Sequence, residues 1–164
     1  MSSKKLTATA LAAALICVVT ITVRLPIPAL SGGYINLGDA ALYLLAAVLG
    51  GLPVALAAAV GSALTDLLVG AAIYAPATFI IKFLMGLIAG GLAWRRKFPR
   101  FALAAVLGGV VMVAGYFLYE ALVFGRAYAL ASAPFNLIQA GVCAALACAL
   151  FPAIRKIDLK GWQR

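Results

Sequence analysis

Histidine is absent from the chain, and acidic residues number only 4 of 164. Its three cysteines, Cys17, Cys143 and Cys148, lie in apolar segments without a paired spacing such as Cys-x-x-Cys. Metal and redox centres need closely spaced Cys and His ligands. We therefore expect no metal site, and we interpret the cysteines as small buried hydrophobic residues.

Catalytic constellations are equally scarce. The sequence has no serine beside a base, no phosphate-binding loop and no run of carboxylates with metal-ligand spacing. We expect a protein that is not an enzyme, needs no cofactor and depends on another subunit or an ion gradient for energy. An integral membrane enzyme is the alternative that turnover of a ligand would support.

Charge is sparse and hydrophobic residues dominate. Charged residues make up 10% of the chain and hydrophobic residues 66%, with a mean hydropathy of +1.15. So few polar side chains cannot cover a water-soluble globule. A spanning helix needs about 20 apolar residues. We predict an all-α integral membrane bundle of six transmembrane helices, with residues 1–164 as one domain.

The apolar segments are separated by turn-forming and basic residues. The second segment is too short to span alone, and Gly50, Gly51 and Pro53 divide it from the third. Lys4, Lys5 and the following apolar run imitate a secretory signal, but no convincing cleavage site follows. The predicted helices cover residues 6–23, 38–49, 53–69, 74–94, 101–124 and 130–154.

Basic residues outnumber acidic ones by 13 to 4 and gather in three clusters. With six spans, all three clusters lie on one side, which the positive-inside rule makes cytoplasmic. We expect cytoplasmic N- and C-termini in a multi-pass protein of the prokaryotic cell membrane. Nucleic acid is excluded as a partner because no basic, aromatic-rich soluble surface is left. The clusters are Lys4 and Lys5; Arg95, Arg96, Lys97 and Arg100; and Arg155, Lys156, Lys160 and Arg164.

The few polar residues within the helices all fall in the outer half of the predicted membrane. A charge in hydrocarbon is costly unless it is paired or hydrated. We therefore expect a shared polar cavity that opens to the outside. Its candidates are Asp39, Asp66, Tyr74, Lys82, Glu120, Asn136 and Gln139, together with Tyr34, Asn36 and Tyr116 at the same level.

Alternatives remain for several of these residues. Asp39 follows Asn36 at a helix start, where a carboxylate can cap the helix. Asp66 and Lys82 could form a structural ion pair in place of direct ligand contacts. Glu120, Asn136 and Gln139 are better ligand candidates, because amides deep in a helix are expensive without a partner.

Aromatic residues gather at the same predicted level. They fit an interfacial belt, or stacking on a flat heteroaromatic ligand. The loop from Arg24 to Leu37 is rich enough in turn formers to be a structured cap or lid. The aromatic residues are Tyr34, Tyr74, Tyr116, Tyr119, Tyr128 and Phe135, and the turn formers are Pro26, Pro28, Gly32 and Gly33.

Small residues recur at four-residue spacing in the first helix. Such a stripe allows close approach of another helix. The stripe therefore packs inside the bundle or docks a separate membrane partner. It consists of Ala8, Ala10, Ala12 and Ala14.

Three stretches carry a resemblance to a known family. Residues 33–39 (GYINLGD), 61–67 (GSALTDL) and 74–82 (YAPATFIIK) resemble the substrate-binding S components of energy-coupling factor (ECF) vitamin transporters. The chain looks most similar to the hydroxymethylpyrimidine or pyridoxine branch, with the riboflavin branch next.

The resemblance implies a six-helix subunit that captures a vitamin or precursor from outside with high affinity, beneath a lid-like first loop. It further implies docking through the first-helix alanines onto a transmembrane coupling subunit driven by two ATPases, and toppling in the membrane to release substrate. The rival is a self-sufficient ion-coupled carrier that uses Asp66, Lys82 and Glu120 as a relay.

Overall fold

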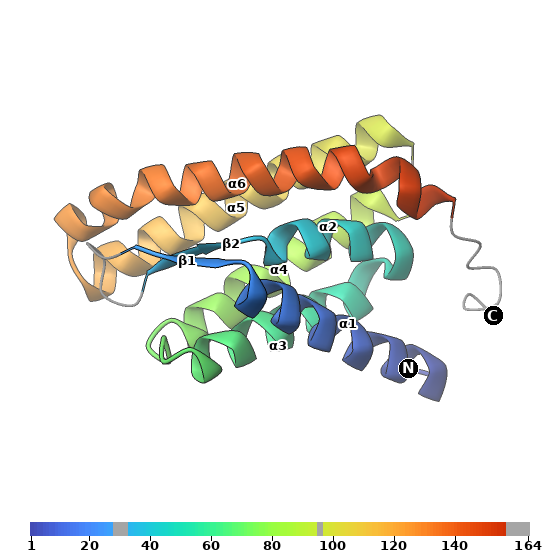
Figure 1. The fold of residues 1–164 in the computed structure, drawn as a ribbon, viewed down its shortest axis with the longest axis horizontal. Coiled ribbons are helices and arrows are strands. Elements are labelled where there is room, and N and C mark those ends of the chain that lie inside the picture. The colour runs from blue at the N-terminus through green and yellow to red at the C-terminus, as the bar shows by residue number, and fades with distance from the viewer. Residues whose placement is uncertain (28–32, 95–96, 157–164) are drawn as a thin grey trace.

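The computed structural model describes residues 1–27, 33–94 and 97–156. Within these ranges the chain forms six α-helices and one two-stranded antiparallel sheet (Figure 1). In chain order the elements are α1 (Ser3–Thr22), β1 (Arg24–Pro26), β2 (Tyr34–Asn36), α2 (Gly38–Leu49), α3 (Gly51–Leu68), α4 (Ala75–Ala93), α5 (Phe98–Val123) and α6 (Arg126–Arg155).

The helices pack as three pairs. The long helices α5 and α6 lie side by side, α1 packs on α3, and α2 and α4 lie between these two pairs (Figure 1). The start of α1 and the end of α6 lie at one end of the bundle, and the β1–β2 hairpin lies at the other (Figure 1). We call the latter the hairpin end.

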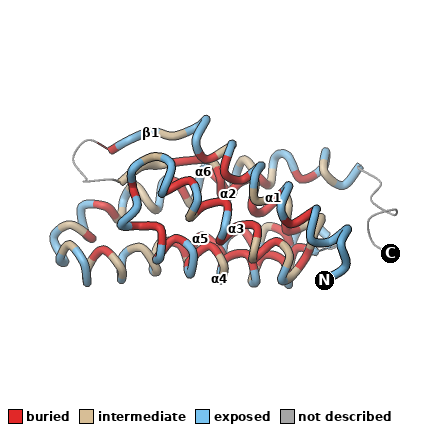
Figure 2. The backbone as a smooth tube through the Cα atoms, turned by 90° about the horizontal axis from the view of Figure 1, so that it is seen from below, coloured by how far each residue is buried: buried red, intermediate tan, exposed pale blue. Residues whose placement is uncertain are grey.

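Apolar side chains cover the outer surface of the bundle as well as filling its core. Large apolar side chains such as Leu11, Val110 and Leu122 are exposed on the outside, whereas Asp39 and Lys82 are buried. Exposed stretches run along the outer faces of the helices (Figure 2). Five described helices, α1 and α3 to α6, are long and apolar enough to cross a membrane, and α2 is shorter. The prediction of an all-helical six-helix fold is confirmed.

The predicted break between the second and third helices is also confirmed. Gly50 adopts φ +69°, a left-handed conformation that favours glycine, and separates α2 from α3. A Cβ at Gly50 would approach the Trp94 ring to 2.7 Å. The turn is therefore both conformationally demanding and tightly packed.

Other boundaries move outward from the prediction. Helix α5 begins at Phe98, because Pro99 fits the first turn of a helix. Helix α6 begins directly after Gly125, whose φ is +94°. Arg126 and Tyr128, predicted in a loop, are therefore in the first turn of α6.

The stripe of alanines on α1 divides between two faces. Ala8 and Ala12 are buried, whereas Ala10 and Ala14 are exposed. Helix α3 approaches α1 closely because it has a glycine at the contact: a Cβ at Gly61 would lie 2.4 Å from the Ala13 carbonyl oxygen. Internal packing therefore accounts for one half of the stripe.

The loop after α1 contains a short hairpin. Strand β1 pairs with β2 so that Arg24 opposes Asn36 and Pro26 opposes Tyr34. Pro28 and Gly32 of the predicted cap lie outside the described residues, as do Arg95, Arg96, Lys160 and Arg164 of the basic clusters. The hairpin carries Tyr34 and Asn36 over the bundle end.

Candidate functional site

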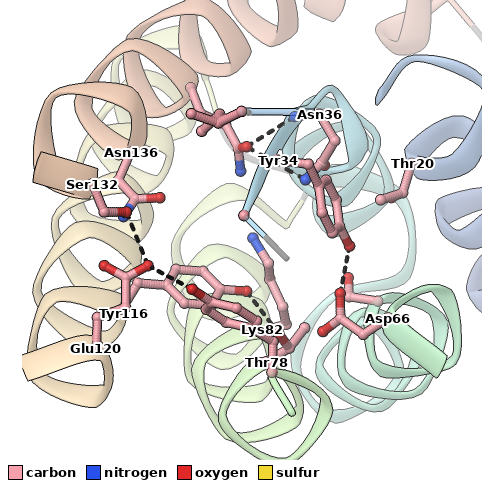
Figure 3. Close-up of a pocket in the computed structure, with 15 residues that line it drawn as sticks. Thr20, Tyr34, Asn36, Asp66, Thr78, Lys82, Tyr116, Glu120, Ser132 and Asn136 are labelled. Atoms are coloured by element: carbon pink, nitrogen blue, oxygen red, sulfur yellow. Dashed lines mark hydrogen bonds between the residues drawn. The ribbon is translucent and has the colours of Figure 1, made fainter. Parts of the chain in front are cut away.

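A polar pocket lies at the hairpin end, between β2 and the helices (Figure 3). Nine of the ten predicted site residues line it, and the tenth, Asp39, lies behind Lys82. The complete lining is Thr20, Ile27, Gly33, Tyr34, Asn36, Ser62, Asp66, Tyr74, Thr78, Lys82, Tyr116, Glu120, Ser132, Asn136 and Gln139.

The free space in this pocket is small. Room for water amounts to about 40 Å³, whereas the whole hollow, with its open mouth, reaches about 530 Å³. Pockets for drug-sized ligands hold roughly 300–1,000 Å³. A ligand larger than a few water molecules therefore has to displace side chains or the hairpin as it enters.

A chain of hydrogen bonds ties the hairpin to three helices beneath the pocket. Lys82 on α4 forms an ion pair with Asp39 on α2, with Nζ and Oδ1 2.5 Å apart. The other Asp39 oxygen accepts from the Gln139 amide on α6 at 2.8 Å, and Gln139 in turn accepts from the Asn36 backbone N–H at 2.9 Å. We call these four residues the latch.

The hydrogen bonds of the latch show that two of the alternatives raised by the sequence are wrong. Lys82 pairs with Asp39 and not with Asp66. Asp39 does not cap α2 through its side chain; instead the Asn36 amide oxygen accepts from the Gly38 N–H at 2.8 Å. The carboxylate is turned toward the buried cation, because an unpaired Lys82 in this interior would be costly.

Asp66, near the end of α3, faces the hairpin. The Tyr34 hydroxyl donates to its Oδ1. Burial and the neighbouring Asp66 charge raise the pKa of Tyr34, so its hydroxyl keeps its proton and serves as a donor. Thr78 lies close to Asp66, and its hydroxyl is 2.9 Å from that of Tyr116.

Glu120 on α5 forms the opposite wall. Its Oε1 accepts from the Ser132 hydroxyl at 2.9 Å and from the Tyr74 hydroxyl at 3.3 Å. Asn136 donates its amide to Ser132 Oγ at 3.3 Å. At the hairpin end, α5, α6 and the residue before α4 are thus joined by side-chain hydrogen bonds around one carboxylate.

The predicted aromatic group separates into two sets. Tyr34, Tyr74 and Tyr116 line the pocket, and Lys82 Nζ lies 5.6 Å from the centre of the Tyr116 ring. Tyr119 and Tyr128 do not line it; they gather with Phe124 around Tyr74 at ring-centre distances of 4.7 to 6.4 Å. Phe135 is also outside the lining.

Sequence reasoning missed several hydroxyl residues of the lining. Thr78 lies four residues before Lys82, and Ser132 lies four residues before Asn136. Side chains four apart share a helix face, so this spacing was an available signal. Ser62 has the same relation to Asp66 on α3. Thr20 carries no such signal, because Ser and Thr are common in membrane helices without a role in a site.

The arrangement suits recognition of an uncharged polar molecule. Three carboxylates, Asp39, Asp66 and Glu120, are buried at or beside the pocket, with Lys82 as the one cation among its described lining residues. The described residues contain no group of three or more His, Cys, Asp or Glu side chains placed to hold a metal ion. Hydroxyl, amide and carboxylate groups surround tyrosine rings, which favours an aromatic ligand with hydrogen-bonding substituents.

Comparison with known proteins identifies the family. A sequence model of the family described as "ECF-type riboflavin transporter, S component" matches residues 1–156. A protein of Pyrococcus woesei, described as "Uncharacterized protein in gap 3'region", is 40% identical over 129 residues, which cover 76% of this chain and 84% of that relative.

The family match corrects the branch expected from the sequence. It names riboflavin, the alternative, and does not support the hydroxymethylpyrimidine or pyridoxine branch. Members of this class bind a vitamin, work with an ECF energising module and are not enzymes. The chain belongs to the S components of ECF-type riboflavin transporters, which are multi-pass proteins of the prokaryotic cell membrane.

Proposed function

We propose that this chain captures riboflavin in the pocket at the hairpin end and delivers it to an ECF energising module. The observation that carries the proposal is the convergence of Tyr34, Tyr74 and Tyr116 with buried polar groups in one pocket of a chain from this family. Riboflavin combines a flat ring system with a polyhydroxylated side chain. Tyrosine rings stack on the former, and carboxylate and amide groups bind the latter.

Entry of the vitamin requires the hairpin or the lining side chains to move. About 40 Å³ of free space cannot hold a three-ring molecule. Tyr34 reaches from β2 to Asp66, and Asn36 is held by Gln139. Together with the bond from the Cys143 thiol to the Asn36 carbonyl oxygen, these bonds join the described part of the hairpin to the helices. Their exchange for ligand contacts is the step that opens the site.

Docking onto the energising module is the second half of the proposal. Ala10 and Ala14 leave a small-residue face of α1 exposed, where a helix of a transmembrane coupling subunit can approach closely. Two ATPases bound to that subunit supply the energy. Ala8 and Ala12 are occupied in packing within the bundle, so they act only indirectly.

The alternative hypothesis, a self-sufficient ion-coupled carrier, has less support. A proton or ion relay through Asp66, Lys82 and Glu120 needs these groups to be linked. Lys82 bonds Asp39, Asp66 accepts from Tyr34, and Glu120 accepts from Ser132. The three groups of the relay therefore belong to separate hydrogen-bond sets.

The test measures riboflavin binding to the purified protein through the quenching of flavin fluorescence. Tyr116→Ala is expected to weaken binding more than about tenfold, since loss of a buried aromatic contact is worth over 1 kcal/mol. Tyr119→Ala, on the same helix but outside the pocket, is the matched control with unchanged affinity.

Two results would contradict the proposal. One is equal affinity in the two alanine variants. The other is mass-spectrometric recovery of a different vitamin, and no flavin, from the denatured protein.

A further inference from the structure

Two carboxylate oxygens in the pocket lining are buried without a hydrogen-bond partner among the described residues. They are Oδ2 of Asp66 and Oε2 of Glu120. Both residues are almost fully buried, with exposed fractions of 2% and 3%. A third unpartnered atom, the Tyr43 hydroxyl oxygen, belongs to a residue of the hydrophobic core that does not line the pocket.

In each carboxylate the partner oxygen is already occupied. Tyr34 donates to Asp66 Oδ1, whereas Ser132 and Tyr74 donate to Glu120 Oε1. The two carboxylates lie on opposite sides of the pocket, with Lys82 between them (Figure 3). A buried acceptor without a donor is destabilising. Each wall of the pocket thus presents one acceptor oxygen that no described protein group satisfies.

The cations nearby are already engaged by other groups. The Lys82 ammonium is held by Asp39 at 2.5 Å. Arg24 lies over the Tyr34 ring, 5.7 Å from its centre, and does not line the pocket. A ligand that brings its own negative charge would therefore face carboxylates on both walls.

We propose that Asp66 and Glu120 determine specificity: they accept hydrogen bonds from ligand O–H or N–H groups and exclude ligands that carry a phosphate. This inference rests on the proposed function, because it takes a flavin as the ligand. Under it, the site binds riboflavin through its hydroxyl or imide donors and rejects riboflavin 5′-phosphate. The protein then imports the vitamin and leaves the phosphate ester outside.

The experiment compares the affinities of the purified protein for riboflavin and for riboflavin 5′-phosphate by fluorescence quenching. The wild-type protein is expected to prefer riboflavin by at least about 30-fold, since like charges brought together in an interface are strongly unfavourable. Glu120→Gln and Asp66→Asn keep the shape but remove the charge and replace one acceptor oxygen by a donor. Each variant is expected to weaken riboflavin binding about tenfold and to reduce the preference at least about fivefold.

Tyr43→Phe is the matched control, because it removes the unpartnered atom that lies away from the pocket. Its affinities and its preference are expected to equal those of the wild type. A thermal unfolding curve in detergent shows whether each variant is folded. If Glu120→Gln or Asp66→Asn does not fold, the other variant is enough for the test.

The outcomes separate the two proposals. The inference is overturned if the protein binds riboflavin but prefers it over riboflavin 5′-phosphate by less than about threefold. It is also overturned if Glu120→Gln and Asp66→Asn leave this preference unchanged. In both cases the proposed function still stands. Absence of any flavin binding by the wild-type protein overturns the proposed function and this inference with it.

Discussion

Lys82 and Asp39 form a buried ion pair to which other polar residues of the pocket are hydrogen-bonded. Their side chains are 4% and 2% exposed, and the pair lies within a bundle of apolar helices. Burying two charges is costly, so such a pair contributes little net stability, but removal of one partner leaves an isolated buried charge. Gln139 and Asn36 extend the pair to the hairpin. The two charges of the pair therefore neutralise each other, and the pair also positions the site.

Lys82→Met tests this at the residue scale. The variant leaves the Asp39 carboxylate buried with Gln139 as its remaining partner, and we expect the free energy of unfolding to fall by about 3–5 kcal/mol. The double variant Asp39→Asn with Lys82→Met is expected to recover most of the loss. Reversible unfolding in SDS–detergent mixtures measures both. Wild-type stability in the single variant would show that the ion pair is dispensable.

Glycine decides how closely the helices approach. A Cβ at Gly86 on α4 would lie 2.5 Å from the Ala55 Cα on α3, and a Cβ at Gly90 would lie 2.5 Å from the Gly51 backbone nitrogen. Backbone atoms cannot move aside as a side-chain tip can. The α3–α4 contact, which holds Asp66 and Lys82 in place, therefore depends on glycine at these positions.

The element-scale test uses two glycines of α4. Gly86→Ala is expected to destabilise the protein by about 1–3 kcal/mol, because the added methyl group forces the two backbones apart. Gly91→Ala is the control, since nothing lies within 4 Å of its added Cβ. It is expected to be neutral or to stabilise by up to about 1 kcal/mol through helix propensity. The same SDS titration compares them, and equal effects would refute the packing argument.

The hairpin gives a second test at this scale. Gln139→Leu removes the acceptor of the Asn36 N–H, so we expect faster hydrogen exchange at that amide while exchange in α3 and α4 is unchanged. Hydrogen–deuterium exchange with mass spectrometry measures both. Unaltered exchange at Asn36 would mean that the bond to Gln139 does not protect this amide.

The whole molecule has two distinct ends. The start of α1 and the end of α6 share one, and the hairpin with the pocket occupies the other (Figure 1). The basic residues Lys4, Lys5, Arg155 and Lys156 lie at the former. The positive-inside rule therefore predicts that the pocket faces outward.

Cysteine labelling tests this orientation. In a background with Cys17, Cys143 and Cys148 changed to Ala, Arg126→Cys is expected to react with an impermeant maleimide on intact cells. Lys4→Cys and Lys156→Cys are expected to react only after the cells are permeabilised. All three positions are exposed. Labelling of Lys4→Cys on intact cells would reverse the orientation.

The membrane class, the six helices and the break at Gly50 follow from the sequence itself. Long apolar runs interrupted by Gly, Pro and basic clusters leave lipid as the only suitable solvent, and each run satisfies its backbone hydrogen bonds as a helix. The gathering of polar residues in one half of the membrane also predicted that they would meet. These features depend on composition and order along the chain, which the sequence contains in full.

The partners of the polar residues were decided only by the tertiary structure. Asp66 is nearer than Asp39 to Lys82 along the chain, yet Asp39 forms the ion pair. Spacing places a side chain on a face of its own helix, but the facing neighbour depends on how each helix is rotated and how closely it approaches the next. Contacts at Gly61 and Gly86 set that approach. Such contacts join residues far apart in sequence, so the residue spacing within one helix cannot predict them.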